Sequence, residues 1–231
     1  MTRIPEVKAL TFDVFGTVLD LGNSLLPHIT RFLQRKGAKV GAPGFWSDWR
    51  ARQRIEQFQD TIMMVGHSGY LETSRRACVY TAALHGIRVS QDEVLELMNG
   101  WQLLSPFPEV LEALHRLKKE YKLVALSNGE PDYLNHLVRN RIQFDFDHVF
   151  SVNTVGAFKP HPSVYRRAAL MLGLEVGQCM MVSANSFDVV GGRACGFKAA
   201  FVNRYSLPYE DTLYKPQITV KDFTELANAL L

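Results

Sequence analysis

Polar residues of catalytic types follow four apolar segments of the chain. They are Asp13 near the end of segment 8–14, Ser127 with Asn128 at the end of 122–127, Lys159 after 148–152, and the stretch from Ser183 to Asp188 at the end of 179–183. A carboxylate can act as a nucleophile or a general base, and an amine, a hydroxyl or an amide can orient a substrate. Each residue alone is explained by a turn or a helix cap. Their joint occurrence predicts one catalytic site.

The apolar segments predict the elements that position these residues. Five segments are suited to buried parallel strands, and helical patterns separate them: residues 8–14, 122–127, 148–152, 179–183 and 199–203. This alternation predicts an α/β protein whose Rossmann-like core is a parallel sheet with helices on both faces. In such a sheet, ligands bind outside the carboxyl ends of the strands.

Residues 21–104 interrupt this alternation, because they contain helical patterns and hardly any strand pattern. Four segments read as amphipathic helices, at residues 25–33, 46–65, 71–84 and 92–103. We therefore expect an α-helical cap domain at 21–104, inserted into a catalytic core made of residues 1–20 and 105–231.

Composition indicates an ordinary globular protein without nucleic-acid or membrane partners. Hydrophobic residues make up 47% of the chain and charged residues 21%, and the net charge of +3 is spread along the sequence. We find no signal-peptide pattern and no apolar run long enough for a membrane span, so we expect a cytoplasmic protein. Three cysteines without CxxC spacing are expected to be buried free thiols: Cys78, Cys179 and Cys195.

Together the polar residues resemble the haloacid dehalogenase superfamily. Its pattern is hhhhDxxGT, then hhhhSN, then a lysine, then a strand followed by acidic residues; this chain has "TFDVFGT", "ALSNG", Lys159 and "VSANSFD". The resemblance extends over nearly the whole chain and includes the helical insertion, which matches the cap of such enzymes. It implies that Asp13 is the nucleophile and that Thr17, which ends the first motif, belongs to the substrate site.

Phe15 distinguishes the chain from the phosphatases of this superfamily. Those enzymes have a second Asp at this position, which protonates the leaving alkoxide. They also hold Mg²⁺ with acidic residues after the last motif strand, where this chain has Ser183 and retains only Asp188. We therefore expect no metal and no other cofactor, and a leaving group that departs as a stable anion.

The L-2-haloacid dehalogenases are the branch that the sequence resembles in most detail. Matching residues are Ser127, Asn128 and Gly129 of "SNG", Lys159 and Tyr165 of "KP…VY", Ser183, Asn185 and Asp188 of SxNxxD, and Arg50 in "WR" on a cap helix. Phe187 supplies the expected aromatic residue before the final Asp, and "VNR" at 202–204 is a further shared string. Phe15 stands where many members have Tyr, and it is assigned to the substrate site.

The resemblance implies hydrolysis of short-chain (S)-2-haloalkanoates to (R)-2-hydroxyalkanoates, with the 2-haloacid and the halide ion as small-molecule partners. Asp13 would attack C2 with inversion and form an ester. Arg50 and Asn128 would bind the departing halide, and Ser127 would bind the substrate carboxylate. Trp46, one helical turn before Arg50, is placed either to stack on its guanidinium or to belong to the core of the cap.

The second half of the implied reaction is hydrolysis of that ester. Asn185 and Asp188 would orient and activate the water. Lys159 would supply the positive charge that keeps the carboxylates ionised, and Ser183 and Tyr165 would orient it. The resemblance also allows a homodimer.

Three other functions stay open at this point. The protein could be a magnesium-dependent small-molecule phosphatase of the same superfamily, or a hydrolase of another C2 electrophile such as a strained cyclic amino acid. A non-catalytic binding module is the least expected of the three. His67 and His85 lack a second ligand at metal spacing, so we assign them no role.

Overall fold

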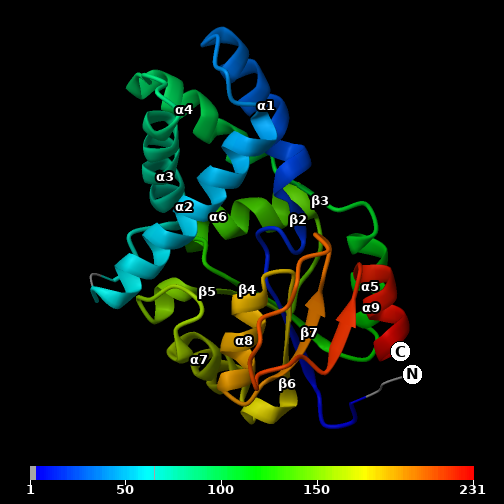
Figure 1. Ribbon diagram of the computed structural model, residues 1–231. Helices are drawn as coiled ribbons and strands as arrows, with labels where there is room; N and C mark the ends of the chain where they lie inside the picture. Colours follow the sequence, from blue (N-terminus) through cyan, green and yellow to red (C-terminus); the bar gives the residue numbers. More distant parts are fainter. Residues whose placement is uncertain (1–3, 65) are drawn as a thin grey trace. The chain divides into compact units, whose positions relative to one another are not determined.

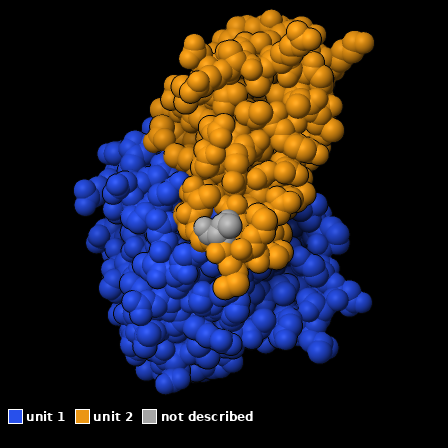
Figure 2. Space-filling model, turned by 90° about the vertical axis from the view of Figure 1, so that its left-hand side faces the viewer, with its two compact units in different colours: residues 1–19, 106–231 blue, residues 20–105 orange. Residues whose placement is uncertain are grey.

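The computed structural model describes residues 4–64 and 66–231. It divides into two compact units, residues 1–19 with 106–231 and residues 20–105 (Figure 2). The boundary runs through two short strands, β2 (Leu19–Asp20) and β3 (Ser105–Pro106), which pair with each other. The two segments that connect the units are therefore neighbours.

A parallel sheet with the strand order β5-β4-β1-β6-β7-β8 forms the centre of the first unit (Figure 1). Its strands are β1 (Ala9–Phe12), β4 (Lys122–Ser127), β5 (His148–Ser151), β6 (Cys179–Ser183), β7 (Lys198–Val202) and β8 (Ile218–Val220). In β1, Phe12 lies level with Ala125 of β4 and with Val182 of β6. The residues that follow these three strands therefore share one edge of the sheet.

Helices cover both faces of this sheet, as the sequence predicts. Successive residues of a strand point to opposite faces, so Ala9 and Phe12 of β1 face different layers. Ala9 belongs to a buried cluster with Tyr165 of α7 (Pro162–Leu172), whereas the Phe12 ring lies 5.6 Å from that of Phe223 in α9 (Phe223–Leu230). The other helical segments of this unit are α5 (Val110–Leu117), α6 (Pro131–His136), the π-helical turn η2 (Leu137–Ile142), the 3₁₀ turns η3 (Val152–Thr154) and η4 (Val176–Gln178), and α8 (Ser186–Ala194).

Helices build the second unit: α1 (Leu21–Arg35), α2 (Ala42–Ile62), α3 (Tyr70–Leu84), α4 (Gln91–Asn99) and the 3₁₀ helix η1 (Gly100–Leu103). The four predicted helices are confirmed, with different ends. Helix α1 begins four residues earlier than predicted, because the Asp20 carboxylate caps it by accepting a bond from Asn23 N. Helix α2 ends at Ile62, and the predicted end at Val65 lies outside the described residues. The final predicted helix changes to a 3₁₀ turn at Gly100.

All five predicted strands are confirmed, with ends that differ by at most two residues. The sixth, β8, was not predicted, because its three residues at the edge of the sheet give too short an apolar pattern. Cys78 and Cys179 are buried free thiols as expected, but Cys195 is only half-buried. No helix among the described residues has the length and apolar character needed to cross a membrane.

Candidate active site

Lys159 lies between two carboxylates at the edge of the sheet. Its Nζ donates to Asp13 Oδ1 at 2.8 Å, to Asp188 Oδ2 at 2.7 Å and to the main-chain oxygen of Leu126 at 2.9 Å. Only 1% of the Lys159 side chain is exposed. All three N–H groups of the ammonium therefore have acceptors, which makes a buried lysine tolerable here.

The second oxygen of Asp13 accepts two further hydrogen bonds. Thr17 Oγ1 and Asn185 Nδ2 each donate to Oδ2 at 2.8 Å. Thr17 reaches back because the chain turns sharply after β1, at Gly16, whose φ of 84° favours glycine. Lys159, Thr17 and Asn185 follow three different strands, and together they fix the orientation of the Asp13 carboxylate.

Tyr165 on α7 holds the second carboxylate. Its hydroxyl donates to Asp188 Oδ1 at 2.6 Å, so both oxygens of Asp188 are engaged. This contact needs a glycine opposite, since a Cβ on Gly191 of α8 would lie 2.6 Å from the Tyr165 oxygen. Tyr165 was expected to orient Lys159; its hydroxyl instead bonds to Asp188, which in turn accepts from Lys159.

The charges of this group are strongly coupled. Burial lowers the pKa of Lys159, but the attraction of Asp13 and Asp188 outweighs it, so this pKa lies above its usual value and the amine is charged. Burial raises the pKa of the Asp188 carboxyl above 3.8, against the lowering effect of Lys159 and together with repulsion from Asp13. Asp188 is therefore the carboxyl in this cluster that takes up a proton more readily than an ordinary aspartate.

Residues 127–129, at the end of β4 and directly after it, complete this edge. Asn128 Oδ1 accepts the main-chain N–H of Lys159 at 2.9 Å, which fixes both the asparagine and the loop that carries the lysine. The buried Ser127 hydroxyl accepts the N–H of Gly129 at 3.3 Å. Ser151 Oγ donates to the Gly129 oxygen at 2.6 Å and so anchors the turn to β5.

The end of β6 and the residues after it carry four of the expected residues: Ser183, Asn185, Phe187 and Asp188. Asn185 reaches Asp13 with its amide, and its main-chain N–H donates to the buried Ser183 hydroxyl at 3.1 Å. Ser183 thus holds the turn that places Asn185, whereas the sequence analysis expected it to orient Lys159. Phe187 is half-buried in the first turn of α8.

Phe15 is buried in the loop after β1. Its ring stacks on that of Tyr133 in α6, with centroids 5.9 Å apart and planes at 18°. A Cβ on Gly129 would lie 3.1 Å from the Phe15 ring, so the glycine of "SNG" leaves room for this aromatic pair. Sequence reasoning missed Tyr133, and its only signal was an aromatic residue four positions after the "SNG" glycine.

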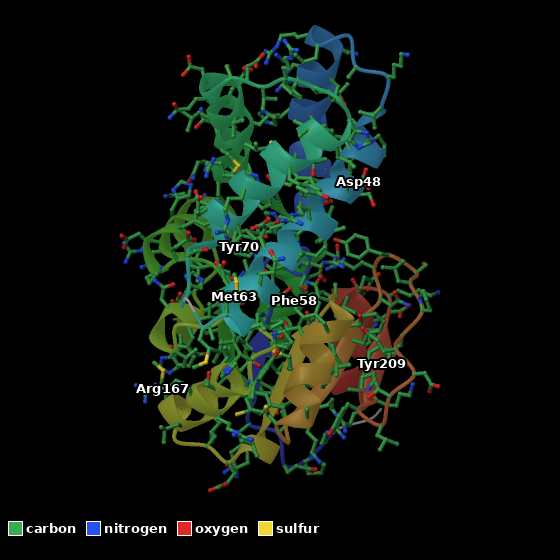
Figure 3. The ribbon with its side chains drawn as sticks, turned by 60° about the vertical axis from the view of Figure 1, so that its left-hand side comes forward. Asp48, Phe58, Met63, Tyr70, Arg167 and Tyr209 are labelled. Atoms are coloured by element: carbon green, nitrogen blue, oxygen red, sulfur yellow. The ribbon has the colours of Figure 1, made fainter. Side chains whose placement is uncertain are left out.

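Arg50 lies in the second unit, on α2, and its guanidinium is held from three sides. Trp46, one turn earlier, lies under it at 5.7 Å, and the same ring packs against Trp49 and Trp101, so both of the alternatives expected for Trp46 are met. Nη1 donates to Gln53 Oε1 and, at 3.1 Å, to the hydroxyl of Tyr70. Tyr70, which Figure 3 labels, begins α3, so two helices of this unit orient the arginine. Sequence reasoning missed both Gln53 and Tyr70, which are buried polar residues one turn and twenty positions after Arg50.

Hydrogen bonds thus join nine of the expected residues in the first unit: Asp13, Phe15, Thr17, Asn128, Lys159, Tyr165, Ser183, Asn185 and Asp188. Ser127 and Ser183 shape the adjoining turns, and Arg50 belongs to the other unit. Within residues 4–64 and 66–231, no group of three or more His, Cys, Asp or Glu side chains is arranged to hold a metal ion. The positive charge between the two carboxylates is the Lys159 ammonium.

Asp13 is a buried carboxylate at the end of the central strand, and a helical unit is inserted after that strand. These two features together are typical of one class of hydrolases. The model of the haloacid dehalogenase-like hydrolase family matches residues 7–196. The chain belongs to this family.

Among the proteins similar to this chain are 2-haloacid dehalogenases. The chain is 31% identical to the (S)-2-haloacid dehalogenase of Xanthobacter autotrophicus, over 87% of this chain and 76% of that protein. A crystal structure of an L-2-haloacid dehalogenase superposes with a TM-score of 0.89 at 26% identity, covering 97% of this chain and 98% of the other. The L-2-haloacid dehalogenase of X. autotrophicus with covalently bound chloropropionic acid has a TM-score of 0.81 at 26% identity, covering 96% of this chain and 97% of the other.

Proposed function

We propose that the protein hydrolyses short-chain (S)-2-haloalkanoates to (R)-2-hydroxyalkanoates through an ester on Asp13. One observation carries the proposal: the Asp13 carboxylate, at the end of the central strand, accepts hydrogen bonds from Lys159, Thr17 and Asn185 and faces a second carboxylate across Lys159. The similarity to dehalogenases, one of them with chloropropionic acid covalently bound, supports the same reaction.

In the first step, an oxygen of ionised Asp13 attacks C2 of the substrate from the side opposite the halogen. A carbon–oxygen bond forms, the carbon–halogen bond breaks, and its electron pair leaves with the halide, so the configuration at C2 inverts. The Lys159 ammonium lies against the Asp13 carboxylate, and the other donors hold the carboxylate in one orientation. This fixed orientation contributes to the rate because it places the reacting atoms in line.

The departing halide takes the negative charge, so hydrogen-bond donors around it lower the barrier. We assign this role to Arg50 and to the Asn128 amide. The Asn128 oxygen is already engaged with Lys159 N, which directs the amide nitrogen to the other side. Ser127 and the main-chain N–H groups after Asp13 bind the substrate carboxylate, and Phe15 and Phe187 supply apolar walls for the carbon chain.

In the second step, water attacks the carbonyl carbon of the Asp13 ester. Asp188 accepts a proton from the water, which Asn185 orients. The bond between the carbonyl carbon and the ester oxygen breaks, the leaving oxygen takes the proton held by Asp188, and the 2-hydroxy acid departs with the oxygen that Asp13 had supplied. The water oxygen remains on Asp13. The raised pKa of Asp188 supports its role as a base, because a more basic carboxylate accepts a proton more readily.

Each Asp188 oxygen accepts one hydrogen bond, from Tyr165 or from Lys159, and keeps a further lone pair for the incoming proton. The bond to Tyr165 is the one that can reverse, because a tyrosine hydroxyl both donates and accepts, whereas the Lys159 ammonium only donates. We therefore assign Tyr165 to the control of Asp188, and Lys159 to the charge balance of both carboxylates.

Halide release tests the proposed function. We would measure it from chloro-, bromo- and fluoroacetate and from both enantiomers of 2-chloropropionate, and determine the configuration of the product lactate. We expect (S)-2-chloropropionate to give (R)-lactate and the other enantiomer to react poorly. Release of phosphate from p-nitrophenyl phosphate that EDTA abolishes, with no halide release, would instead identify a phosphatase.

The Asp13→Asn variant and isotope labelling test the nucleophile. Asp13→Asn should fold normally, as judged by circular dichroism, and release no halide. In a single turnover in heavy-oxygen water, we expect the label on Asp13 and unlabelled product. Label in the product of that first turnover would mean that water attacks C2 directly.

A further inference from the structure

Two residues after β7 hold the loop that follows Asp13. Arg204 Nε donates to the main-chain oxygen of Thr17 at 3.1 Å, and the Tyr205 hydroxyl donates to that of Gly16 at 3.0 Å. Thr17 is the residue whose hydroxyl donates to Asp13 Oδ2. Residues 202–204 form the "VNR" string, which the proposed reaction does not use.

Arg204 is itself tightly fixed. Its side chain is 7% exposed, and Nη1 lies 2.6 Å from Glu109 Oε1. The guanidinium lies 3.8 Å from the ring centre of Phe107 and 5.1 Å from that of Phe223. An arginine held by an ion pair and two rings has little rotational freedom, so its Nε–H points at the Thr17 oxygen in a fixed direction.

We propose that Arg204 is a positioning residue for Asp13 and acts through Thr17. The inference rests on the proposed function of Asp13 as a nucleophile. Arg204 fixes the main chain of Thr17, and the Ala184 N–H, 2.9 Å from Thr17 Oγ1, fixes its hydroxyl from the other side. The hydroxyl then has one direction in which to donate, and that direction is Asp13 Oδ2.

This arrangement affects the attack step in particular. Without the bond from Arg204, the Thr17 main chain can move, and Asp13 loses the donor that restrains the rotation of its carboxylate. A nucleophile displaced by about 1 Å can lose roughly 100-fold in rate. A merely structural role for Arg204 would instead lower the stability of the fold and leave the attack step of the folded enzyme unchanged.

Three variants separate these roles. Glu109→Gln weakens the ion pair but leaves the Arg204 Nε–H in place, and it is the matched control. Arg204→Lys keeps a positive charge beside Glu109 but has no Nε–H. Arg204→Met combined with Glu109→Gln removes both charges, so that no partly buried carboxylate is left unpaired.

The measurements are the rate of the halide burst, the KM for 2-chloropropionate and the melting temperature. We expect Glu109→Gln to keep the burst rate within about twofold, and Arg204→Lys and the double variant to lower it by roughly 10- to 100-fold with KM changed much less. Burst rates within threefold of wild type in Arg204→Lys and in the double variant would overturn the inference. So would restoration of the burst by lysine, because that would show that charge alone suffices.

Two further measurements keep the test decisive. If the double variant does not fold, Arg204→Lys carries the comparison together with Tyr205→Phe, which removes the hydroxyl that donates to the main-chain oxygen of Gly16. Crystal structures of wild type and Arg204→Lys give a readout without turnover: we expect the contact between Thr17 Oγ1 and Asp13 Oδ2 to be lost in the variant. An unchanged contact overturns the inference, whereas a wild-type enzyme that releases no halide overturns only the proposed function.

Discussion

The Tyr165 hydroxyl bonds to the one oxygen of Asp188 that Lys159 leaves unoccupied. Tyr165 donates to Oδ1 at 2.6 Å, and Lys159 donates to Oδ2 at 2.7 Å. Both donors stabilise the ionised carboxylate and so lower the pKa of Asp188. Burial raises this pKa and is the larger effect. The pH dependence of ester hydrolysis should therefore depend on Tyr165.

Replacing Tyr165 by Phe should raise the pKa of Asp188 further, because one donor to its ionised form is lost. A general base acts only when deprotonated, so activity is lost as the pH falls through its pKa, and a higher pKa moves this acid limb to higher pH. We expect the acid limb of kcat to move upward and kcat at pH 7 to fall by about tenfold. Tyr209→Phe, whose hydroxyl bonds to Tyr214 O in the same unit, is the matched control and should leave the profile unchanged.

Replacing Asp188 by Asn should stop the second step and spare the first. Enzyme mixed with excess substrate should release one halide per active site and then slow by about 100-fold or more, because the base is missing. Mass spectrometry should find the ester on the peptide that contains Asp13. Equal losses of burst and steady-state rate would show that Asp188 acts before the ester forms.

Replacing Lys159 by Met should abolish activity and destabilise the fold. Two buried carboxylates would face each other without a cation, and loss of one partner from a buried ion pair costs about 3–5 kcal/mol. Protonation of one carboxyl relieves the repulsion, so its pKa in the folded variant lies above the unfolded value and stability is lost as the pH rises through it. Denaturant unfolding should therefore give a smaller difference from wild type at pH 5 than at pH 8; the same difference at both would contradict the charge-balancing role.

Phe15 allows a test of the choice between dehalogenase and phosphatase. Phe15→Tyr keeps the ring that stacks on Tyr133 and should lower activity only modestly, since an unpartnered buried hydroxyl costs about 1–3 kcal/mol.

Phe15→Asp places a second negative charge beside Asp13 that competes for Lys159, so dehalogenation should collapse at neutral pH. Phosphatase activity should still be absent because Ser183 leaves a metal site one carboxylate short. Magnesium-dependent phosphate release by Phe15→Asp would contradict this interpretation.

Tyr70 should affect halide binding through Arg50. Tyr70→Phe removes the hydroxyl that accepts from Arg50 Nη1 and keeps the ring that packs on Trp101. We expect the burst rate to fall by about three- to tenfold, as for the loss of one hydrogen bond, with weaker inhibition by product halide. Tyr80→Phe, on the same helix α3 and half-exposed, is the control and should behave like wild type.

Much of the catalytic core could be predicted from sequence because buried parallel strands are continuous apolar runs. Segments 122–127 and 179–183 coincide with β4 and β6, and the polar residues that follow them meet Asp13 as the shared sheet edge requires. The location of the candidate site therefore follows from the pattern alone. The assignment of each hydrogen bond does not.

Tyr165 and Ser183 illustrate why the assignments failed. Tyr165 belongs to the same motif as Lys159 and Ser183 to the next one, so the sequence suggested that both orient Lys159. The sheet register and the close approach of α7 to Gly191 instead direct Tyr165 to Asp188. Tyr133, Tyr70 and Arg204 were missed for a related reason: their partners are 118, 20 and 187 positions away, and no local periodicity encodes such contacts.

The place of β1 in the middle of the sheet also determines when the candidate site can exist during synthesis. Its two neighbours, β4 and β6, begin at Lys122 and Cys179, and Asp188 is made later still. Ribosomes add about 5–20 residues per second, so roughly 10 to 35 seconds separate the synthesis of Asp13 from that of Asp188. For most of this interval, until β6 and Asn185 are made, the nascent chain carries its central strand without the β6 partner, and Asp13 without Asn185. The candidate site is therefore one of the last features of the protein to be completed, although its central residue is among the first to be made.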